Sequence, residues 1–95
     1  MTKIEDFKYS EDKNLSQLKN ICVKADSLAL KKTFEYLRIL FYFTKPEKII
    51  AKIIPNVAYI VATIAKKHIR IVDLGVVKVY QHKGIGRLLI NCIIE

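Results

Sequence analysis

The sequence predicts an α+β fold with its elements in the order β-α-α-β-β-β-α. Two stretches of the first half, 12–25 and 27–43, repeat apolar residues every three or four positions, as amphipathic helices do. Three stretches of the second half, 49–54, 57–64 and 69–77, are rich in β-branched residues and follow one another with short breaks. We therefore expect a mostly antiparallel sheet with helices packed on it, without an internal repeat.

The length and composition predict a single domain over residues 1–95. Hydrophobic residues make up 52% of the chain and charged residues 27%, an ordinary balance for a globular protein. The longest stretch without a charge, 53–65, falls short of the about 20 apolar residues that a membrane-spanning helix needs. Charged residues also occupy the place where a signal peptide would have its apolar core. We therefore expect a cytoplasmic protein without a membrane partner.

The first strand and the two helices after it follow from local patterns. Phe7 and Tyr9 alternate with polar residues and indicate a short strand. Ser10 or Asp12 can cap the first helix, and Asp26-Ser27 can cap the second. The expected apolar faces of the two helices consist of Leu15, Leu18, Ile21, Cys22, Ala25, Leu30, Phe34, Leu37, Leu40 and Phe41.

The second half of the chain is assigned mainly to strands. Ile49–Ile54 fits either one more helical turn or a strand. We assign a strand, because the turn signal Pro55-Asn56 follows and leads into another strand pattern. Val57–Ile64 is apolar on both faces and should be a central, covered strand. Ile69–Val77 has the same two-sided apolar character, and Ile85–Glu95 has the pattern of an apolar helix.

The basic charge balance suggests an anionic partner without identifying it. The formal net charge is +8, with 17 lysines and arginines against nine aspartates and glutamates. Such a surface attracts nucleic acid, an anionic membrane or a phosphate-rich cofactor, and it equally fits a solvated lysine-rich surface. The sequence has no run of five basic residues, and its aromatic residues do not interleave with basic ones. These features argue against a nucleic-acid partner.

The cysteines and histidines do not predict a metal site. Cys22 and Cys92 each lie inside an apolar helical pattern, far apart in the sequence, without the spacing of a zinc site or a disulfide framework. His68 and His82 are isolated and add no ligand set. We expect both cysteines to be small core residues.

The most informative segment lies between the last strand and the last helix. Gly84 and Gly86, two positions apart, permit a tight turn that brings backbone N–H groups close to a ligand. The helix that follows directs its unsatisfied N–H groups and its dipole at the same place, and Lys83 and Arg87 add positive charge. Such a turn can bind phosphate. A simple tight connection without a ligand is the alternative.

Known phosphate-binding motifs narrow this interpretation. A dinucleotide fingerprint needs a third glycine where Leu89 stands, and the spacing of a P-loop does not occur. Gln81, Gly84 and Gly86 instead match the Q/R-x-x-G-x-G/A loop of the acyl-CoA-dependent N-acyltransferases, the GNAT superfamily. Residues 74–89 resemble the family's fourth strand, loop and third helix, and the hairpin before them resembles its second and third strands.

The resemblance implies a GNAT-like fold that is truncated at its C-terminus. The sequence ends inside the segment that resembles the third helix, whereas a typical member of the family continues with a fifth strand, a fourth helix and closing strands. Those elements usually complete the active site. The resemblance therefore predicts the cofactor-binding part of the family's active site without the part that usually completes it.

The resemblance also implies the residues that would hold acetyl-CoA as a co-substrate. The backbone N–H groups of residues 82–87 would bind its pyrophosphate, Gln81 would open the loop, and strand backbone at two positions would pair with the pantetheine arm. The implied cofactor-binding residues are Leu74, Val76, Gln81, His82, Lys83, Gly84, Ile85, Gly86 and Arg87.

Asp73 is the candidate catalytic residue. Acetylation needs a neutral acceptor amine, which a nearby carboxylate can provide, and Asp73 is the only acid between Glu47 and Glu95. A structural carboxylate paired with Arg70 or a lysine is the alternative, and it is favoured. Tyr59 and His68 fit structural roles better than catalytic ones.

The resulting prediction is an N-acetyltransferase that moves an acetyl group from acetyl-CoA to an amine. A protein N-terminus, a lysine or a small amine would all fit as the acceptor. The alternative is a non-catalytic GNAT-like module that binds CoA or pairs with a second copy through the exposed edge of the fourth strand. A small basic nucleic-acid-binding protein is a third and weaker hypothesis.

Overall fold

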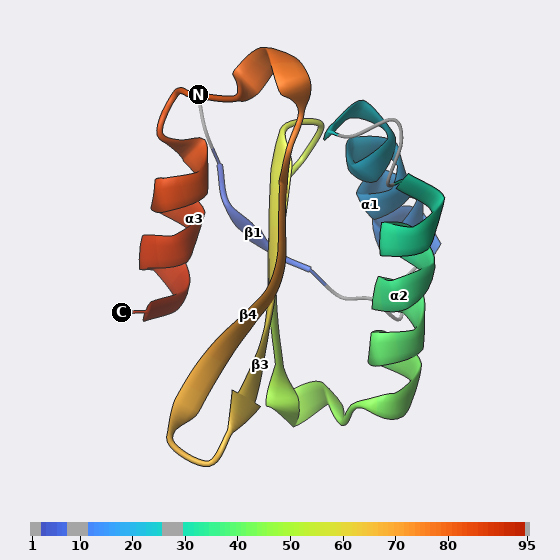
Figure 1. Ribbon diagram of the computed structural model, residues 1–95, viewed down its shortest axis with the longest axis vertical. Helices are drawn as coiled ribbons and strands as arrows, with labels where there is room; N and C mark the ends of the chain where they lie inside the picture. Colours follow the sequence, from blue (N-terminus) through green and yellow to red (C-terminus); the bar gives the residue numbers. More distant parts are fainter. Residues whose placement is uncertain (1–2, 8–11, 26–29, 95) are drawn as a thin grey trace.

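The computed structural model describes residues 3–7, 12–25 and 30–94. Its described part has the predicted α+β architecture, with four strands in one antiparallel sheet and helices on both faces (Figure 1). The strands lie in the order β1-β2-β3-β4, so each is paired with its neighbour in the sequence. The elements are β1 (Glu5–Asp6), α1 (Asp12–Ala25), α2 (Leu30–Phe43), the 3₁₀ turn η1 (Pro46–Lys48), β2 (Ile49–Ile54), β3 (Ala58–Ala65), β4 (His68–Val76), the 3₁₀ turn η2 (Lys78–Tyr80) and α3 (Ile85–Ile94).

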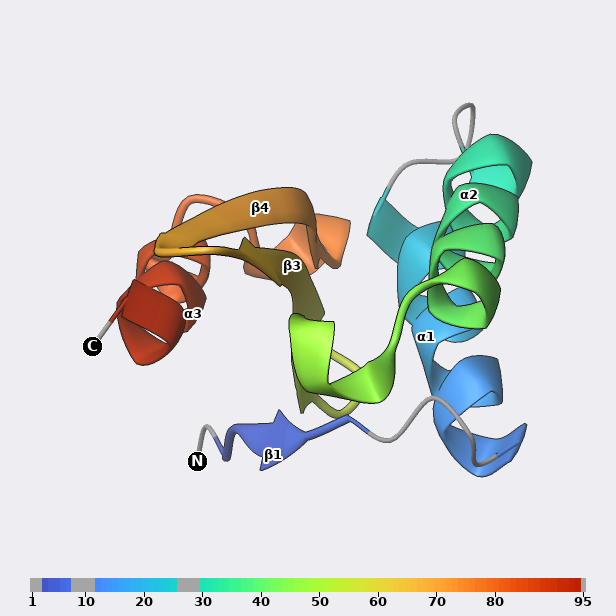
Figure 2. The same ribbon diagram turned by 90° about the horizontal axis from the view of Figure 1, so that it is seen from below.

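Two helices cover one face of the sheet. Figure 2 shows α1 and α2 side by side on the face opposite to α3. The apolar positions repeat at three- and four-residue spacing, so they converge on the sheet and exclude water, and burial of each large side chain contributes about 1.5–3 kcal/mol. The buried residues of this core include Leu18, Ile21 and Cys22 from α1, Leu37 and Phe41 from α2, and Ala51, Ile53, Tyr59 and Val61 from the sheet.

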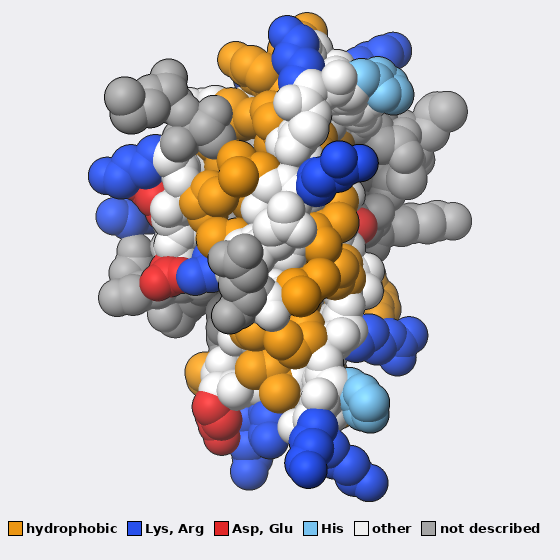
Figure 3. All heavy atoms as spheres, turned by 90° about the vertical axis from the view of Figure 1, so that its left-hand side faces the viewer, with side chains coloured by type: hydrophobic (Ala, Val, Ile, Leu, Met, Phe, Trp, Pro, Cys, Tyr) orange, Lys and Arg blue, Asp and Glu red, His pale blue; other side chains and the backbone are white. Residues whose placement is uncertain are grey.

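The third helix covers the other face. Leu89 and Ile93 are buried against Ile60 and Ala62 of β3, which makes β3 the central strand predicted from its two-sided apolar pattern. The outer side of α3 keeps Leu88 and Ile94 in solvent. Figure 3 shows hydrophobic side chains extending along this side of the molecule.

The turn between β2 and β3 confirms the strand assignment for Ile49–Ile54. The N–H of Val57 donates to the carbonyl of Ile54 at 2.9 Å, with Pro55 and Asn56 between them. Asn56 has φ 65°, a left-handed conformation that asparagine tolerates better than most residues. Proline followed by a residue of positive φ is the pattern of a type II turn, and it reverses the chain into β3.

The first strand is earlier than predicted. β1 consists of Glu5 and Asp6, and Asp6 forms an ion pair with Lys52 of the neighbouring β2. Phe7 lies just beyond this strand, where its N–H donates to the carbonyl of Ala51 at 3.0 Å and its ring is buried near α2. Tyr9 lies outside the described residues, as do three of the predicted helix caps (Ser10, Asp26 and Ser27) and Glu95.

The fourth strand corrects the expectation of two covered faces. Its first half is exposed, and Ile69 and Ile71 retain 44% and 40% of their surface, because the β3–β4 hairpin extends past the end of α3 (Figure 1). Its pairing with β3 is also irregular: Val61 faces Asp73, whereas the next residue, Ala62, faces Ile71. Val72 is therefore the extra residue of a β-bulge.

One cysteine assignment is wrong. Cys22 is buried in the α1 core as expected, but Cys92 is exposed, because Leu89 and Ile93 are the α3 residues directed at the sheet. Within the described ranges, the helices are too short and insufficiently apolar to cross a membrane.

Candidate functional site

The segment that leads from β4 into α3 is held by backbone hydrogen bonds where it leaves β4. The N–H of Val77 donates to the carbonyl of Val57 at 2.8 Å, which anchors the end of β4 to the β2–β3 turn. The N–H of Tyr80 then donates to the carbonyl of Val77 at 2.8 Å and closes the 3₁₀ turn η2. These bonds fix where the loop begins.

Gln81 connects the loop to the strand before it. Its Nε2 donates to the carbonyl of Val76 at 3.0 Å, so the side chain spans from the start of the loop to the last residue of β4. A carboxylate could not donate this bond, and a shorter amide would not reach as far. The side chain of Gln81 therefore shapes the loop.

The loop turns sharply before the helix begins. His82 and Gly84 have φ of 65° and 80°, in the left-handed region. A Cβ on Gly84 would meet no atom within 4 Å, so the backbone conformation, and not the available space, favours glycine there. The first turn of α3 then closes with a bond from the N–H of Leu88 to the carbonyl of Gly84, at 3.0 Å.

The N-terminal end of α3 can bind an anion. The N–H groups of Ile85, Gly86 and Arg87 precede the first intrahelical bond, so the helix itself leaves them unsatisfied. The helix dipole adds partial positive charge at the same end. Gly86 also allows α3 to start close to β4, because a Cβ there would lie 3.3 Å from Cδ2 of Leu74.

A hollow of about 290 Å³ lies between the end of β4 and the start of α3. All the predicted cofactor-binding residues except Lys83 and Arg87 line it, and those two side chains are exposed beside the loop. Its lining residues are Leu74, Val76, Tyr80, Gln81, His82, Gly84, Ile85 and Gly86. The fold thus brings residues of one strand, one loop and one helix to a single concave surface.

Two further residues, which the sequence analysis did not propose as binding residues, border this region. Tyr80 lines the hollow, and its place directly before Gln81 was the signal that could have identified it. Tyr80 and Ile85 also line a neighbouring hollow of about 380 Å³ to which Lys3 contributes. Lys3 carried no signal, because its position depends on the pairing of β1 with β2.

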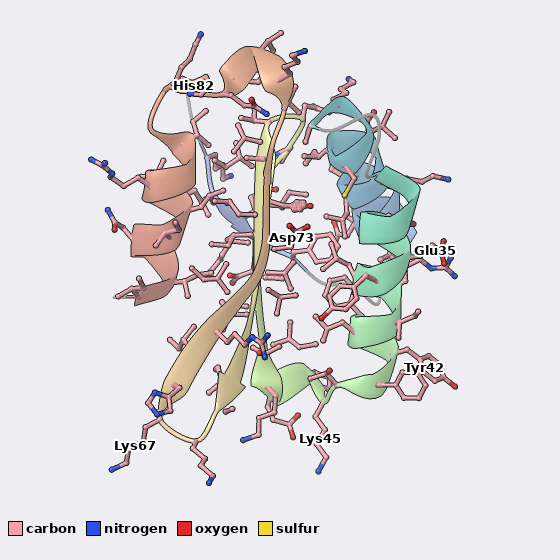
Figure 4. All side chains as sticks on the ribbon, in the orientation of Figure 1. Glu35, Tyr42, Lys45, Lys67, Asp73 and His82 are labelled. Carbon is pink, nitrogen blue, oxygen red and sulfur yellow. The ribbon has the colours of Figure 1, made fainter. Side chains whose placement is uncertain are left out.

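Asp73 lies on the other face of the sheet. Leu74 and Val76 pack with the α3 core, whereas Tyr59, the hydrogen-bond partner of Asp73, belongs to the core under α1 and α2. Figure 4 shows Asp73 near the middle of β4, with His82 of the loop at the upper end of the molecule. The structure therefore does not place the predicted catalytic carboxylate and the predicted cofactor loop in one pocket.

The partner of Asp73 is a tyrosine. Tyr59 Oη donates to Asp73 Oδ2 at 2.5 Å, and Cys22 Sγ donates to Tyr59 Oη at 3.5 Å. Among the described residues, Asp73 forms no salt bridge with Arg70 or a lysine, so its partner differs from those expected of a structural carboxylate. Asp73 thus satisfies a buried hydroxyl.

Burial keeps the Tyr59 hydroxyl and the Cys22 thiol protonated. Desolvation raises the pKa of Tyr59 far above its ordinary value of 10.0, and the hydrogen bond to Asp73 raises it further. Burial also raises the pKa of Cys22, although its hydrogen bond to Tyr59 acts in the opposite direction. The Cys22 thiol is therefore a poor nucleophile.

Over the described ranges, histidine, cysteine and acidic side chains do not gather in a group that could hold a metal ion.

Comparison with solved structures identifies the fold. The ribosomal-protein-S18-alanine N-acetyltransferase from Escherichia coli superposes with a TM-score of 0.72, over 99% of this chain and at 19% sequence identity. The chain has a GNAT-like fold. It spans 57% of the length of that enzyme. No protein-family model matches the sequence, and no curated protein matches it either.

Proposed function

We propose that this GNAT-like chain binds acetyl-CoA with the loop 81–87 and acts as an N-acetyltransferase on an amine. Its GNAT-like fold supports an acetyltransferase at a general level and does not identify the acceptor amine. The hollow between β4 and α3 is the observation that carries the proposal.

The loop offers what a pyrophosphate needs. The N–H groups at the start of α3 and the left-handed turn at Gly84 provide donors without a side chain in the way, and Lys83 and Arg87 add positive charge from solvent. Phosphate groups are large and multiply charged, so an exposed site of this kind can bind them without a deep cavity. The side chain of Gln81 would keep the loop in this shape.

The edge of β4 offers a place for the rest of the cofactor. β4 is the outermost of the described strands, and the side chains of Leu74 and Val76 line the hollow. A ligand with amide groups, such as the pantetheine arm, can pair with such an edge as an added strand does. The thioester would then lie alongside β4.

The reaction would join the acceptor nitrogen to the acetyl carbon and break the bond from that carbon to sulfur. The amine must lose a proton, and the departing CoA thiolate must gain one. We propose Asp73 as the carboxylate on the acceptor side of β4, where its negative charge attracts an ammonium group. Tyr59 would hold this carboxylate in place.

Calorimetry with acetyl-CoA tests the cofactor site. We expect the unmodified chain to bind, Gly86→Gln to bind more weakly because its side chain crowds Leu74, and Gly86→Glu to lose at least about tenfold more, because a carboxylate there repels phosphate. Glutamine and glutamate have nearly the same size, so their difference isolates the charge. A folded chain that gives no heat with acetyl-CoA contradicts the proposal.

The second candidate is a module that binds CoA or a second copy of itself without catalysis. The exposed first half of β4 favours it, because an unpaired edge can join the same edge of another chain. Sedimentation at several concentrations measures self-association, and turnover with a panel of amines separates the enzyme from the module. Acetyl-CoA binding without turnover of any amine favours the module.

A further inference from the structure

The bulge in β4 places Arg70 and Asp73 on the same face of the sheet. Side chains of a regular strand alternate between faces, so residues three positions apart normally point in opposite directions. Here Arg70 is paired with Thr63 and Asp73 is paired with Val61. Thr63 and Val61 are two residues apart on β3, so their side chains lie on the same face of the sheet. Their partners on β4 share that face because the bulge accommodates Val72 as an extra residue. The irregularity therefore aligns one cation and one anion along the α2 side of β4.

A small pocket adjoins the arginine on this face. It has a volume of about 160 Å³ and lies between α2 and the β3–β4 hairpin. Its lining combines apolar side chains with two hydroxyl groups and one guanidinium. The lining residues are Tyr36, Leu40, Thr63, Arg70, Ile71 and Val72. Leu74 and Val76, which line the cofactor hollow, pack on the opposite face of the sheet, so the two pockets are distinct.

The pocket has an unbalanced positive charge. In the part of the chain that the structure describes, Arg70 has no acidic partner, and Glu35 on the adjacent helix pairs with Arg38 at 3.2 Å instead. A guanidinium presents several donors in a plane and matches a carboxylate or another planar anion well. The hydroxyls of Tyr36 and Thr63 can complete the set of donors.

We propose that this pocket binds the anionic group of the acyl acceptor, so that the preferred acceptor is an amine that also carries a carboxylate. This inference rests on the proposed function, because it identifies the substrate class of the same transferase. The carboxylate of the acceptor lies on Arg70, and its amine extends along β4 toward Asp73. The bulge gives both ends of such an acceptor a partner of opposite charge.

The spacing of the two side chains limits the length of the acceptor. Their partners on β3 are two residues apart, which corresponds to about 7 Å along a strand. The carboxylate and the amine must therefore be separated by several bonds. An N-terminal peptide amine followed by aspartate has this arrangement, and so does a small amino acid with its amine away from the α position.

Binding experiments with matched acceptors test the pocket. One pair consists of short amidated peptides that differ only in aspartate against asparagine at the second position, and the other pair is β-alanine and β-alaninamide. We expect the carboxylate member of at least one pair to bind about three- to tenfold more tightly to the full chain at low salt. The pair that shows the preference tells whether the acceptor is a peptide or a small amino acid.

Two variants assign the preference to Arg70. Arg70→Gln should abolish it, whereas Lys67→Gln, which removes the same charge from the exposed tip of the hairpin, should preserve it. Neither residue is buried, so both variants should fold, and acetyl-CoA affinity should be the same in both. A preference that survives Arg70→Gln overturns the inference, as does the absence of any preference in a chain that binds acetyl-CoA. A chain with the Arg70-dependent preference but no affinity for acetyl-CoA retains the anion pocket and loses the proposed transferase.

Discussion

Gly75 of β4 lies directly opposite Tyr59 of β3, and the ring of the tyrosine occupies the space where a side chain of residue 75 would be. A Cβ on Gly75 would come within 2.7 Å of ring atoms Cε1 and Cζ of Tyr59. The ring is buried and its hydroxyl is fixed between Asp73 and Cys22. The glycine therefore allows the tyrosine to lie flat across the β3–β4 pair.

Gly75→Ala should destabilise the fold, because the Tyr59 ring is buried and can move away from the new Cβ only by disturbing the hydrogen bonds of its hydroxyl. We expect a loss of about 1–3 kcal/mol in the free energy of unfolding, as for other overpacked cores. Urea denaturation followed by circular dichroism measures it. Tyr59→Phe should not relieve the loss, because the ring atoms in conflict remain.

A double-mutant cycle distinguishes this contact from a general intolerance of β4 to substitution. Combining Gly75→Ala with Tyr59→Val removes the ring, so the alanine should cost much less in that background. The coupling free energy should reach about 1 kcal/mol or more, within the range found for residues in contact. Additive effects would show that the Tyr59 ring is not the obstacle.

The buried tyrosine should also make the fold sensitive to alkaline pH. The pKa of Tyr59 is higher in the folded state than its value of about 10 in the unfolded state. The protonated tyrosine therefore stabilises the fold fully below about pH 10, and this stabilisation is lost as the pH rises further. Above about pH 10, this one group should lower the free energy of unfolding by about 1.4 kcal/mol per pH unit.

Tyr59→Phe is the matched control for the alkaline effect, because it keeps the ring and removes the ionisable hydroxyl. The difference in stability between the two proteins should be constant near neutral pH and should shrink above pH 10. Other effects of alkaline pH act on both proteins alike and cancel in this difference. A difference that stays constant to pH 11 would mean that Tyr59 ionises in the folded state as it does in solution.

The fold could be predicted largely because each element carried its own local signal. The three- and four-residue spacing of apolar residues in α1 and the β-branched residues of β3 identify these elements without any knowledge of their neighbours. Pro55-Asn56 likewise predicted the reversal after β2, and the structure shows a type II turn there. The prediction failed for the faces of β4, because an apolar pattern cannot tell that the β3–β4 hairpin extends past α3 and leaves the first half of the strand in solvent.

The candidate cofactor loop could be proposed from the sequence because its residues are contiguous. The pairing of Tyr59 with Asp73 could not, since it depends on the register between two strands and on the bulge at Val72. A bulge leaves no local signal when the extra residue is an ordinary valine. For the same reason, the pocket at Arg70 and the place of Lys3 near the loop become visible only in the folded chain.

The charges beside the loop should contribute to acetyl-CoA binding in a salt-dependent way. Lys83 and Arg87 are exposed and lie outside the lining of the hollow, so they act on the phosphates through solvent and not through enclosed contacts. Replacing both by glutamine should weaken binding by about two- to fivefold per charge at low ionic strength, and the effect should largely vanish at 1 M salt, where the screening length is about 3 Å. Calorimetry at both salt concentrations measures this.

Lys45 and Lys67 provide the matched control for this change of charge. They lie at the opposite end of the molecule from His82 (Figure 4), so replacing these two lysines by glutamine makes the same change in net charge away from the loop. Equal losses in the two double variants would attribute the effect to net charge, whereas a loss confined to Lys83 and Arg87 supports phosphate binding at the start of α3.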